Sequence, residues 1–570
     1  MGRLRAAITP ARLLLGLIVV AGLALRLWHN DYGLPYVYNV DEGSHFSAKA
    51  IGLFRDANPG YFQNPSAYTY LLHALLRFKY GGLWPLGDFD HLIEQYREDP
   101  SAVYDTARSL AAVICMAGVV AVAWAARRLW GAREAVAAAA LLAFAFLPVT
   151  YSRIAVTDVG TLAPVAVAVY GAVRAYETGA RRWFALAGAA AGLAVGFKYT
   201  AGLVALPAGL AGLLWLRRDA RAALAGLGLA AACAVAAFFV TTPYFFLDFD
   251  TAWRQIEAQA ETAGDYAKLG QAQDNGFLYY LDTLTWGLGW VALAAAGAGF
   301  ALVLRRDPVR ALLLGAFPVA LFVYLAVQSR YFGRWLLPVY PVLVMLAGVA
   351  LVRAAALVRG RPRLQLVALG ALLVVALAQP VAADVRTGRL LGRTDTRELA
   401  REWLRTHYPP RLRAIVEPAV PARWYRLARP GRRAPLSRKQ FVRGFAEDVA
   451  ESRIDYAATL SPERIDLYRR YGFCVVVTMS VIRGRAENDE VPGALAYYDR
   501  LEREARLLKV FSPFEPGADE PPFHFDLSYN YYPTAYERPG PVVKIYELRD
   551  CDQRYGPVPK GVGTPEVARR

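Results

Sequence analysis

The sequence predicts a polytopic α-helical membrane protein with about eleven transmembrane helices and a C-terminal extracytoplasmic α/β domain. The chain has 570 residues, of which 56% are hydrophobic, and a mean hydropathy of +0.24. Its apolar residues form blocks of about 15–22 residues separated by short charged segments, which is the pattern of membrane spans. Beyond about residue 383 the long blocks end, and shorter helix and strand patterns replace them.

The apolar blocks define the predicted spans in order along the chain. They cover residues 12–29, 107–126, 133–150, 159–176, 183–197, 199–216, 222–242, 284–304, 309–327, 335–353 and 364–382. Some blocks are short, so the pattern is compatible with about ten to twelve spans.

Basic residues at alternate junctions predict how the spans are oriented. Arg3, Arg5 and Arg12 precede the first block, and arginines recur at every second junction after it, beginning with Arg127 and Arg128. Positive charge marks the cytoplasmic ends of spans, so we expect the N-terminus inside and, with an odd number of spans, the C-terminal part outside. The net charge of +17 lies in loops rather than on a continuous basic face, and nucleic acid is not expected as a partner.

Two longer segments interrupt the alternation of span and short loop on the predicted outer side. Residues 30–106 are rich in Tyr, Pro, Asp and Gly and contain helical patterns near 42–55 and 66–80. Residues 243–283 contain an amphipathic helix that we expect to lie along the membrane surface. Both segments belong to the predicted membrane domain, residues 1–383.

The predicted C-terminal domain covers residues 384–570. "DTRELAREWLRTHYPP" predicts an amphipathic helix capped by Thr394 or Asp395. Strands are predicted at "LRAIVE", "IDYAAT", "CVVVTM" and "PVVKIYEL", with helices near 437–450, 462–470 and 493–508. The domain contains no nucleotide-binding or zinc-protease motif, so we do not expect it to carry out catalysis. Its expected role is either to help shape an acceptor site or purely structural.

The four cysteines fall into two pairs by location. Cys115 and Cys233 lie in predicted spans, where they are expected to be packing residues. Cys474 and Cys551 lie in the predicted external domain, where a disulfide is chemically allowed. Two unpaired thiols remain the alternative, because the sequence does not give the distance between them.

Charged residues also gather at four junctions on the predicted outer side. Ionisable groups at membrane depth are costly and are therefore candidates for function. They are Asp41, Glu42, His45 and Lys49 after the first span, Tyr151, Arg153 and Asp158 after the third, Lys198 and Tyr199 after the fifth, and Arg330, Tyr331 and Arg334 after the ninth. If the spans form a bundle, these groups converge on one cavity at the outer surface.

This set of side chains fits group transfer from a lipid-linked phosphate. A carboxylate can accept the proton of an attacking hydroxyl, and Arg or Lys can offset the charge that develops on a phosphate leaving group. ATP is absent on the outer side, so an activated lipid carrier is the expected donor. The structural alternatives are that Asp41 and Glu42 are solvated capping residues, that Arg153 and Asp158 form an ion pair, and that Lys198 and Arg334 are anchors at the membrane interface.

Several motifs resemble the membrane glycosyltransferases of the GT-C class, particularly bacterial relatives of the protein O-mannosyltransferases and of the lipid A aminoarabinose transferase. "VDEGSHFSAKA" resembles the acidic motif of the first outer loop in that class, and "NPSAYTYLLHAL" resembles the segment that follows it. "YSRIAVTD", "AGLAVGFKYTAGLVALP" and "SRYFGRWLLPVYPVL" resemble the later junctions. The order of these motifs agrees over nearly the whole chain.

The resemblance implies a polyprenyl-phosphate-linked sugar as donor, a hydroxyl acceptor and inversion at the anomeric carbon. It implies that Asp41 is the catalytic base, with Glu42 beside it and Asp158 as a second acidic residue of the site. The candidates for substrate binding are His45, Arg153, Lys198, Tyr199, Arg330, Tyr331 and Arg334. Relatives often carry His or Lys where this chain has Asn64, which affects the expected sugar or acceptor contacts.

No metal site or other cofactor is predicted, although Asp41, Glu42 and His45 could bind a divalent ion and some GT-C enzymes use one. The expected location is the bacterial inner membrane, and the expected partners are the bilayer, the lipid-linked donor and a protein, lipid or glycan acceptor. The alternatives are a secondary transporter or lipid flippase, a structural protein of the envelope, and a transferase of another group from the same carrier. Transporters usually hold charges near the midplane on broken helices, whereas the junction charges of this chain gather at one face. The sequence leaves the sugar, the acceptor and the oligomeric state open.

Overall fold

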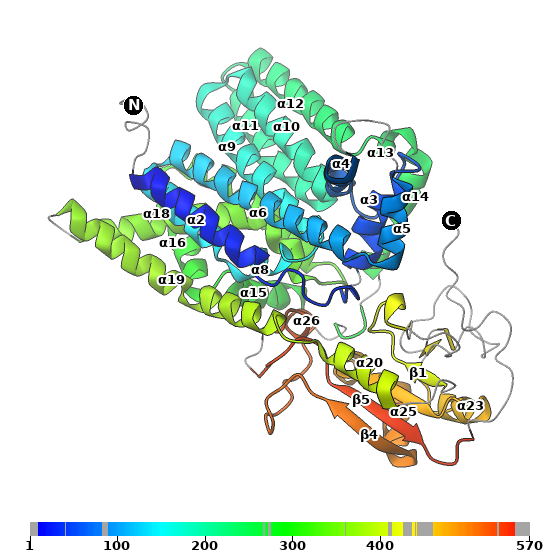
Figure 1. Ribbon diagram of the computed structural model, residues 1–570. Coiled ribbons are helices and arrows are strands. Elements are labelled where there is room, and N and C mark those ends of the chain that lie inside the picture. The colour runs from blue at the N-terminus through cyan, green and yellow to red at the C-terminus, as the bar shows by residue number, and fades with distance from the viewer. Residues whose placement is uncertain are drawn as a thin grey trace. The chain divides into compact units, whose positions relative to one another are not determined.

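The computed structural model describes residues 10–39, 41–81, 89–265, 268–271, 275–358, 361–407, 413–425, 436–438, 440–441, 460–532 and 535–552. The chain forms two compact units (Figure 1). The helical unit comprises Met1–Asp31, Asp41–Tyr266 and Asn275–Gly388, and the α/β unit comprises Tyr32–Val40, Ala267–Asp274 and Arg389–Arg570. The sequence-based boundary at residue 383 lies just before the observed one, within helix α19 (Pro362–Leu391).

Helices occupy every predicted span. They are α2 (Pro10–Leu27), α6 (Ser101–Leu129), α7 (Ala132–Ala143) with α8 (Phe146–Tyr151), α9 (Leu162–Thr178), α10 (Arg181–Phe197), α11 (Ala205–Leu216), α12 (Ala220–Thr241), α15 (Gly276–Gly287) with α16 (Trp290–Arg306), α17 (Pro308–Ala326), α18 (Tyr340–Ala356) and α19. By length and apolarity, eight helices of the described chain can cross a membrane, or nine if the pair α15 and α16 counts as one span. This pair is bent by 109°, so the predicted span 284–304 is not one straight helix.

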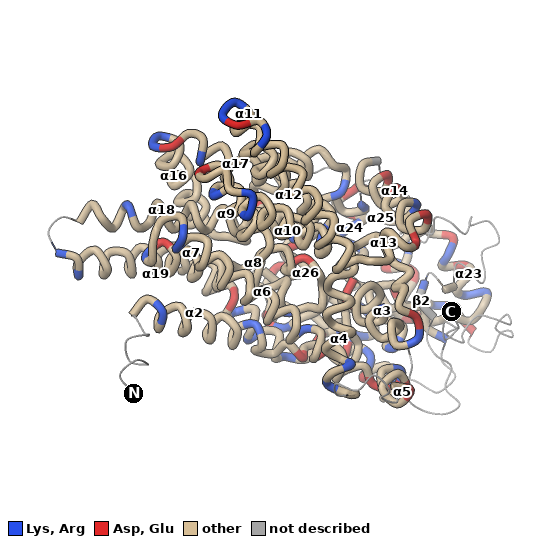
Figure 2. The backbone as a smooth tube through the Cα atoms, turned by 90° about the horizontal axis from the view of Figure 1, so that it is seen from above, with Lys and Arg blue, Asp and Glu red and all other residues tan. Residues whose placement is uncertain are grey.

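The charge distribution in the helical unit agrees with a protein embedded in a membrane. Lys, Arg, Asp and Glu concentrate at helix ends and turns, for example between α11 and α12, while most of each long helix is uncharged (Figure 2). Many large apolar side chains face outward, among them Val240 with 77% exposure. Exposed apolar surface of this kind is costly in water and favourable in lipid. The chain is therefore a multi-pass membrane protein.

Small residues allow the closest helix contacts in this bundle. α10 packs against α12, and "GAAAG" places Gly188 and Gly192 one turn apart on α10. A Cβ at Gly188 would lie 2.0 Å from the carbonyl oxygen of Ala230, and one at Gly192 would lie 2.0 Å from that of Ala234. The two backbones meet in the manner of the small-xxx-small motif of membrane helices.

The two long loops of the helical unit are ordered against each other. The first contains η1 (Glu42–Phe46), α3 (Ser47–Gly52), α4 (Ala67–Gly81) and α5 (Asp90–Glu98), and the second contains α13 (Tyr244–Leu247) and α14 (Phe249–Asp265). Asn58 donates to Asp248 at 2.8 Å, and the backbone N–H of Phe62 donates to Gln255 at 2.7 Å. These contacts fix the chain near Tyr61. The position of α14 at the membrane surface remains a prediction.

The α/β unit is built on a five-stranded sheet in the order β2-β1-β3-β5-β4. The strands are β1 (Ala414–Val416), β2 (Leu436–Ser437), β3 (Val475–Met479), β4 (Ala505–Phe511) and β5 (Val543–Leu548), and β5 is antiparallel to β3 and β4. Helices α20 (Thr396–His407), α23 (Arg464–Arg470), α24 (Ser480–Asn488) and α25 (Pro492–Glu504) accompany the sheet.

Four sequence predictions in this unit have three different outcomes. The helix predicted over 493–508 is wrong beyond Glu504, because Ala505–Phe511 pairs with β5 as an edge strand. The cap at Asp395 is confirmed, since its carboxylate accepts the backbone N–H of Arg397 at 2.8 Å. The predicted strand "IDYAAT" and most of the predicted helix 437–450 lie outside the described residues.

The core of the α/β unit holds a buried carboxylate and a disulfide. Glu417 accepts hydrogen bonds from Arg438 at 2.9 Å, from the Tyr498 hydroxyl at 2.6 Å and from the N–H of Met479 at 2.6 Å. Cys474 and Cys551 form a disulfide, which settles the alternative left open by the sequence.

Candidate functional site

Three charged junction residues of the bundle sit at the start of short 3-10 helices. Asp158 begins η2 (Asp158–Thr161), Lys198 directly precedes η3 (Tyr199–Val204), and Arg334 lies in η4 (Gly333–Val339). Each 3-10 helix leads into a long helix, namely α9, α11 and α18. This repeated geometry brings three side chains from distant parts of the sequence to one level of the bundle.

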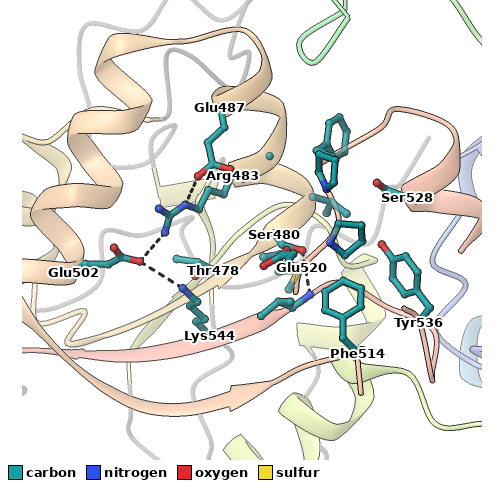
Figure 3. Close-up of a pocket in the computed structure, with 17 residues that line it drawn as sticks. Thr478, Ser480, Arg483, Glu487, Glu502, Phe514, Glu520, Ser528, Tyr536 and Lys544 are labelled. Atoms are coloured by element: carbon teal, nitrogen blue, oxygen red, sulfur yellow. Dashed lines mark hydrogen bonds and ion pairs between the residues drawn. The ribbon is translucent and has the colours of Figure 1, made fainter. Parts of the chain in front are cut away.

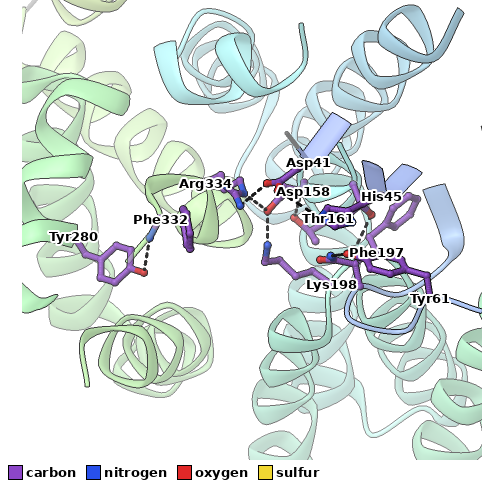
Figure 4. Close-up of polar contacts among 12 residues, drawn as sticks. Asp41, His45, Tyr61, Asp158, Thr161, Phe197, Lys198, Tyr280, Phe332 and Arg334 are labelled. Carbon is purple, nitrogen blue, oxygen red and sulfur yellow. Dashed lines mark hydrogen bonds and ion pairs between the residues drawn. The ribbon is translucent and has the colours of Figure 1, made fainter. Parts of the chain in front are cut away.

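Asp41 contributes the fourth charge, from the first long loop of the helical unit, directly before η1. Its Oδ2 accepts a hydrogen bond from Nη2 of Arg334 at 2.8 Å (Figure 4). Its Oδ1 lies 3.8 Å from Nε2 of His45. The Asp41 side chain retains 35% exposure, so a substrate can reach this carboxylate.

Asp158 and Lys198 form the more deeply buried part of the cluster. Nζ of Lys198 donates to Oδ1 of Asp158, and the Lys198 and Asp158 side chains are 10% and 5% exposed. Nε of Arg334 lies 3.9 Å from the same oxygen. Arg334 therefore links the accessible Asp41 carboxylate to the buried Asp158–Lys198 pair, and the site holds two cations and two carboxylates.

Aromatic rings surround this cluster. The Tyr61 ring stacks on His45 with centroids 4.9 Å apart and an interplanar angle of 7°. The Trp335 ring lies 5.8 Å from Nζ of Lys198, and the Phe332 ring lies 4.4 Å from the Arg334 guanidinium. Such faces stabilise nearby cations and restrict the positions that the charged side chains can adopt.

The His45 imidazole lies beside Asp41 in a partly buried position. Burial lowers the pKa of His45, with smaller contributions from Arg334 and Lys49 in the same direction and an opposing one from Asp41. A neutral imidazole beside Asp41 can donate or accept one hydrogen bond without neutralising the carboxylate.

Glu42 points away from this cluster and forms a buried clamp. Both of its oxygens accept hydrogen bonds from Arg108, from Nε at 2.6 Å and from Nη2 at 2.9 Å. The N–H of Ala155 donates to Glu42 at 2.9 Å, and Nη1 of Arg108 donates to the carbonyl of Asn30. Glu42 is 0% and Arg108 1% exposed. The clamp joins the residue after Asp41 to α6 and to the segment before Asp158.

Arg153 belongs to a second buried group. Its Nη2 donates to the carbonyl of Leu25 at 2.8 Å, and it interacts electrostatically with Asp384 of α19, as does Arg26 of α2. Asp384 is 0% exposed, and no hydrogen bond to its carboxylate is found among the described residues. The three charges tie α2, the segment after α8 and α19 together.

Three other predicted site residues, Tyr199, Tyr331 and Arg330, make contacts outside the charged cluster or are partly buried. Tyr199 directly follows Lys198 in the sequence. Its hydroxyl donates a hydrogen bond to the carbonyl of Phe62 at 3.0 Å. Tyr331 is buried, with its ring 5.3 Å from that of Tyr279. Arg330 is partly buried.

An apolar cavity of about 620 Å³ begins at Tyr199. Its lining comes from η3, from α11 and from Tyr324 of α17, and includes Leu203, Leu206, Leu210 and Leu213. Gly209 also lines it, and a Cβ at Gly209 would meet nothing within 4 Å. This apolar volume thus begins at the residue that directly follows Lys198 in the sequence.

Sequence reasoning missed several residues of this region. Arg108 and Arg26 each carry a charge within a predicted span, and a charge in an apolar segment is a detectable signal of a buried partner. Tyr61 and Trp335 carry no such signal, because aromatic residues are common throughout the chain. Among the described residues, no group of three or more His, Cys, Asp or Glu side chains is arranged to hold a metal ion.

Comparisons with known proteins point to one class. Residues 103–244 match the model of the dolichyl-phosphate-mannose-protein mannosyltransferase family. The structure of the Archaeoglobus fulgidus oligosaccharyltransferase in the apo form is similar over 88% of this chain and 73% of that one, with a TM-score of 0.52 and 13% identity. This match shows that the chain has the fold of the GT-C class of membrane glycosyltransferases.

Another structure of this class resembles the chain over nearly its full length. ArnT from Cupriavidus metallidurans bound to undecaprenyl phosphate aligns over 95% of this chain and 98% of that one, with 15% identity and a TM-score of 0.47. A search of curated proteins finds no match. The GT-C fold predicted from the sequence is confirmed.

Proposed function

We propose that the chain transfers a sugar from a polyprenyl-phosphate-linked donor to a hydroxyl acceptor at the outer face of a bacterial inner membrane, with inversion at the anomeric carbon. The observation that carries this proposal is the cluster of Asp41, Arg334, Lys198 and Asp158, in which an accessible carboxylate lies beside two cations. The N-terminus then lies in the cytoplasm and the α/β unit outside, as the arginine pattern predicts.

In this mechanism Asp41 accepts the proton of the acceptor hydroxyl. The hydroxyl oxygen forms a bond to the anomeric carbon on the face opposite the phosphate, and the bond from that carbon to the phosphate oxygen breaks. The electron pair leaves with polyprenyl phosphate, whose added negative charge Lys198 and Arg334 offset. A single displacement by one base gives inversion and needs no covalent intermediate with the enzyme.

In this proposal Arg334 makes donor binding precede proton transfer to Asp41. Nη2 of Arg334 donates to Asp41 at 2.8 Å, and a guanidinium at this distance favours the ionised carboxylate. A phosphate carries more charge than a carboxylate and competes for the guanidinium. Donor binding therefore frees Asp41 to act as a base. Glu42 keeps Asp41 in place through Arg108 rather than reacting itself.

The direct test is donor consumption by the purified chain in nanodiscs. Radiolabelled polyprenyl-phosphate sugars, including hexoses and pentoses, are supplied singly, and release or transfer of the sugar is measured. Consumption of one donor supports the proposal and identifies the sugar. If the folded protein neither binds nor consumes any donor, the proposal fails, and uptake into sealed vesicles then tests the transporter or flippase alternative.

The cavity next to Tyr199 predicts where the lipid tail of the donor binds. Gly209→Phe fills part of that cavity, since nothing lies within 4 Å of a Cβ there. We expect KM for a long-chain donor to rise about 10-fold, because the added ring takes space that apolar chain atoms would occupy, while a donor with a very short chain is affected little.

Gly228→Phe is the matched control for this change. Gly228 lies on α12 and has equally open surroundings, but it does not line the cavity. Equal effects of the two substitutions, or equal effects on long and short donors, would show that the tail binds elsewhere.

The low pKa of His45 predicts a pH effect on activity. Burial lowers the pKa of His45 from the usual histidine value, so the imidazole gains a proton only as the pH falls below the usual histidine range. The imidazolium would pair with Asp41, 3.8 Å away, and weaken it as a base. We therefore expect kcat to fall only at pH values below the usual histidine range, and His45→Gln to shift this fall to still lower pH. An unchanged profile in His45→Gln would contradict the assignment.

A further inference from the structure

The α/β unit contains a cavity of about 480 Å³ that the proposed transfer reaction does not use (Figure 3). It lies at the carboxyl end of β3, where Thr478 and Met479 form part of its lining, and next to Val542 and Lys544 at the start of β5. The carboxyl ends of strands in open α/β sheets are common ligand sites. A volume of this size is within the range of small-molecule pockets.

One side of the cavity combines aromatic rings with hydroxyl groups. The Phe514 and Tyr536 rings are 4.8 Å apart. The Ser480 hydroxyl oxygen accepts the backbone N–H of Val542 at 3.1 Å, and the Ser528 hydroxyl oxygen accepts that of His524 at 3.0 Å. Pro521, Pro522 and Phe523 continue this wall. Phe523 packs closely against the backbone of Gly484, because a Cβ at Gly484 would lie only 2.7 Å from Cβ of Phe523.

The opposite side of the cavity is closed by ion pairs. Arg483 donates to Glu487 and to Glu502, each at 2.6 Å, and Nζ of Lys544 lies 3.5 Å from Glu502. Both cations of the lining are thus paired with carboxylates. With Glu520 added, the lining holds two cations and three carboxylates, so it has no excess positive charge with which to bind a phosphate or another anion.

We propose that this pocket binds a neutral saccharide unit. The partly exposed Phe523 ring would contact the C–H face of a pyranose, while the exposed Glu520 carboxylate, together with the Ser480 hydroxyl, would hydrogen-bond adjacent sugar hydroxyls. The volume admits a monosaccharide or a disaccharide. Saccharide binding at this pocket does not depend on the donor chemistry of the membrane site.

Saturation-transfer NMR with the full chain in nanodiscs tests this assignment. The probes are D-glucose, D-mannose, D-galactose, N-acetyl-D-glucosamine and maltose, each added alone. We expect ring-proton saturation from at least one probe, with a dissociation constant of about 0.1–10 mM. Glu520→Gln removes the charged acceptor and should weaken binding of that probe about 10-fold.

Glu515→Gln is the matched control, since Glu515 is an exposed carboxylate of the same segment and does not line the cavity. It should leave binding unchanged. The inference is overturned if no probe shows saturation, or if Glu520→Gln and Glu515→Gln have the same effect. Donor consumption by the wild-type preparation is measured in parallel, so that loss of saccharide binding with intact donor consumption rejects this inference and leaves the proposed function standing.

Discussion

Asp41→Asn should reduce sugar transfer by about 10²-fold or more, because it removes the general base while keeping the size of the side chain. Asn can still accept a hydrogen bond from Arg334, so the local geometry is expected to survive. The carboxylate is 35% exposed and lies beside two cations of the cluster. The measurement is the rate of label release from the preferred donor at saturating concentration, with binding of the donor followed separately.

Asp31→Asn serves as the control for this prediction. Asp31 is an exposed carboxylate shortly after the first span, and its substitution should leave the rate within about 2-fold of the wild type. Asp41→Asn should lower kcat more than it changes donor affinity. If Asp41→Asn consumes donor as fast as the wild type, Asp41 is not the base, and Asp158 becomes the next carboxylate to test.

Arg108→Met should destabilise the helical unit by about 3–5 kcal/mol, because it leaves Glu42 as an unpaired charge in a fully buried position. Met fills a similar volume, so the effect arises mainly from charge rather than from a cavity. Unfolding of the detergent-solubilised protein by heat or denaturant, followed by tryptophan fluorescence, measures the loss. Arg174→Met, which breaks an exposed pair with Glu177, should cost much less.

The double variant Glu42→Leu/Arg108→Met separates charge from packing. Removing both charges eliminates the buried unpaired carboxylate, so the double variant should be more stable than Arg108→Met alone. If the two variants are equally unstable, packing around Arg108 rather than the ion pair holds the loop. Because the clamp positions Asp41, either variant should also lower the transfer rate even where the protein remains folded.

Much of the helical unit was predictable, because a membrane span needs a long apolar segment and such segments are visible in sequence. The junction residues Asp41, Asp158, Lys198 and Arg334 were predictable for the opposite reason, since charge at the edge of an apolar block is exceptional. Their convergence followed once the spans were assumed to bundle. The assignment of Asp41 as base remains a prediction.

The different surroundings of Asp41 and Glu42 could not be read from the sequence. Adjacent residues of a helical turn project in different directions, and only the position of Arg108 decides which carboxylate is buried. Asp384 was missed for a similar reason, because it lies just beyond a predicted span and resembles a boundary residue. The edge strand β4 was missed because its pairing with β5 is a tertiary contact.

The disulfide between Cys474 and Cys551 has a consequence for how the protein is made. It links residues 77 positions apart and joins the start of β3 to the chain after β5. Such bonds form in oxidising compartments and are rare where thiols are kept reduced. We therefore expect this disulfide to form only where the α/β unit meets an oxidising environment, and a host without thiol-oxidising enzymes there should accumulate the reduced form.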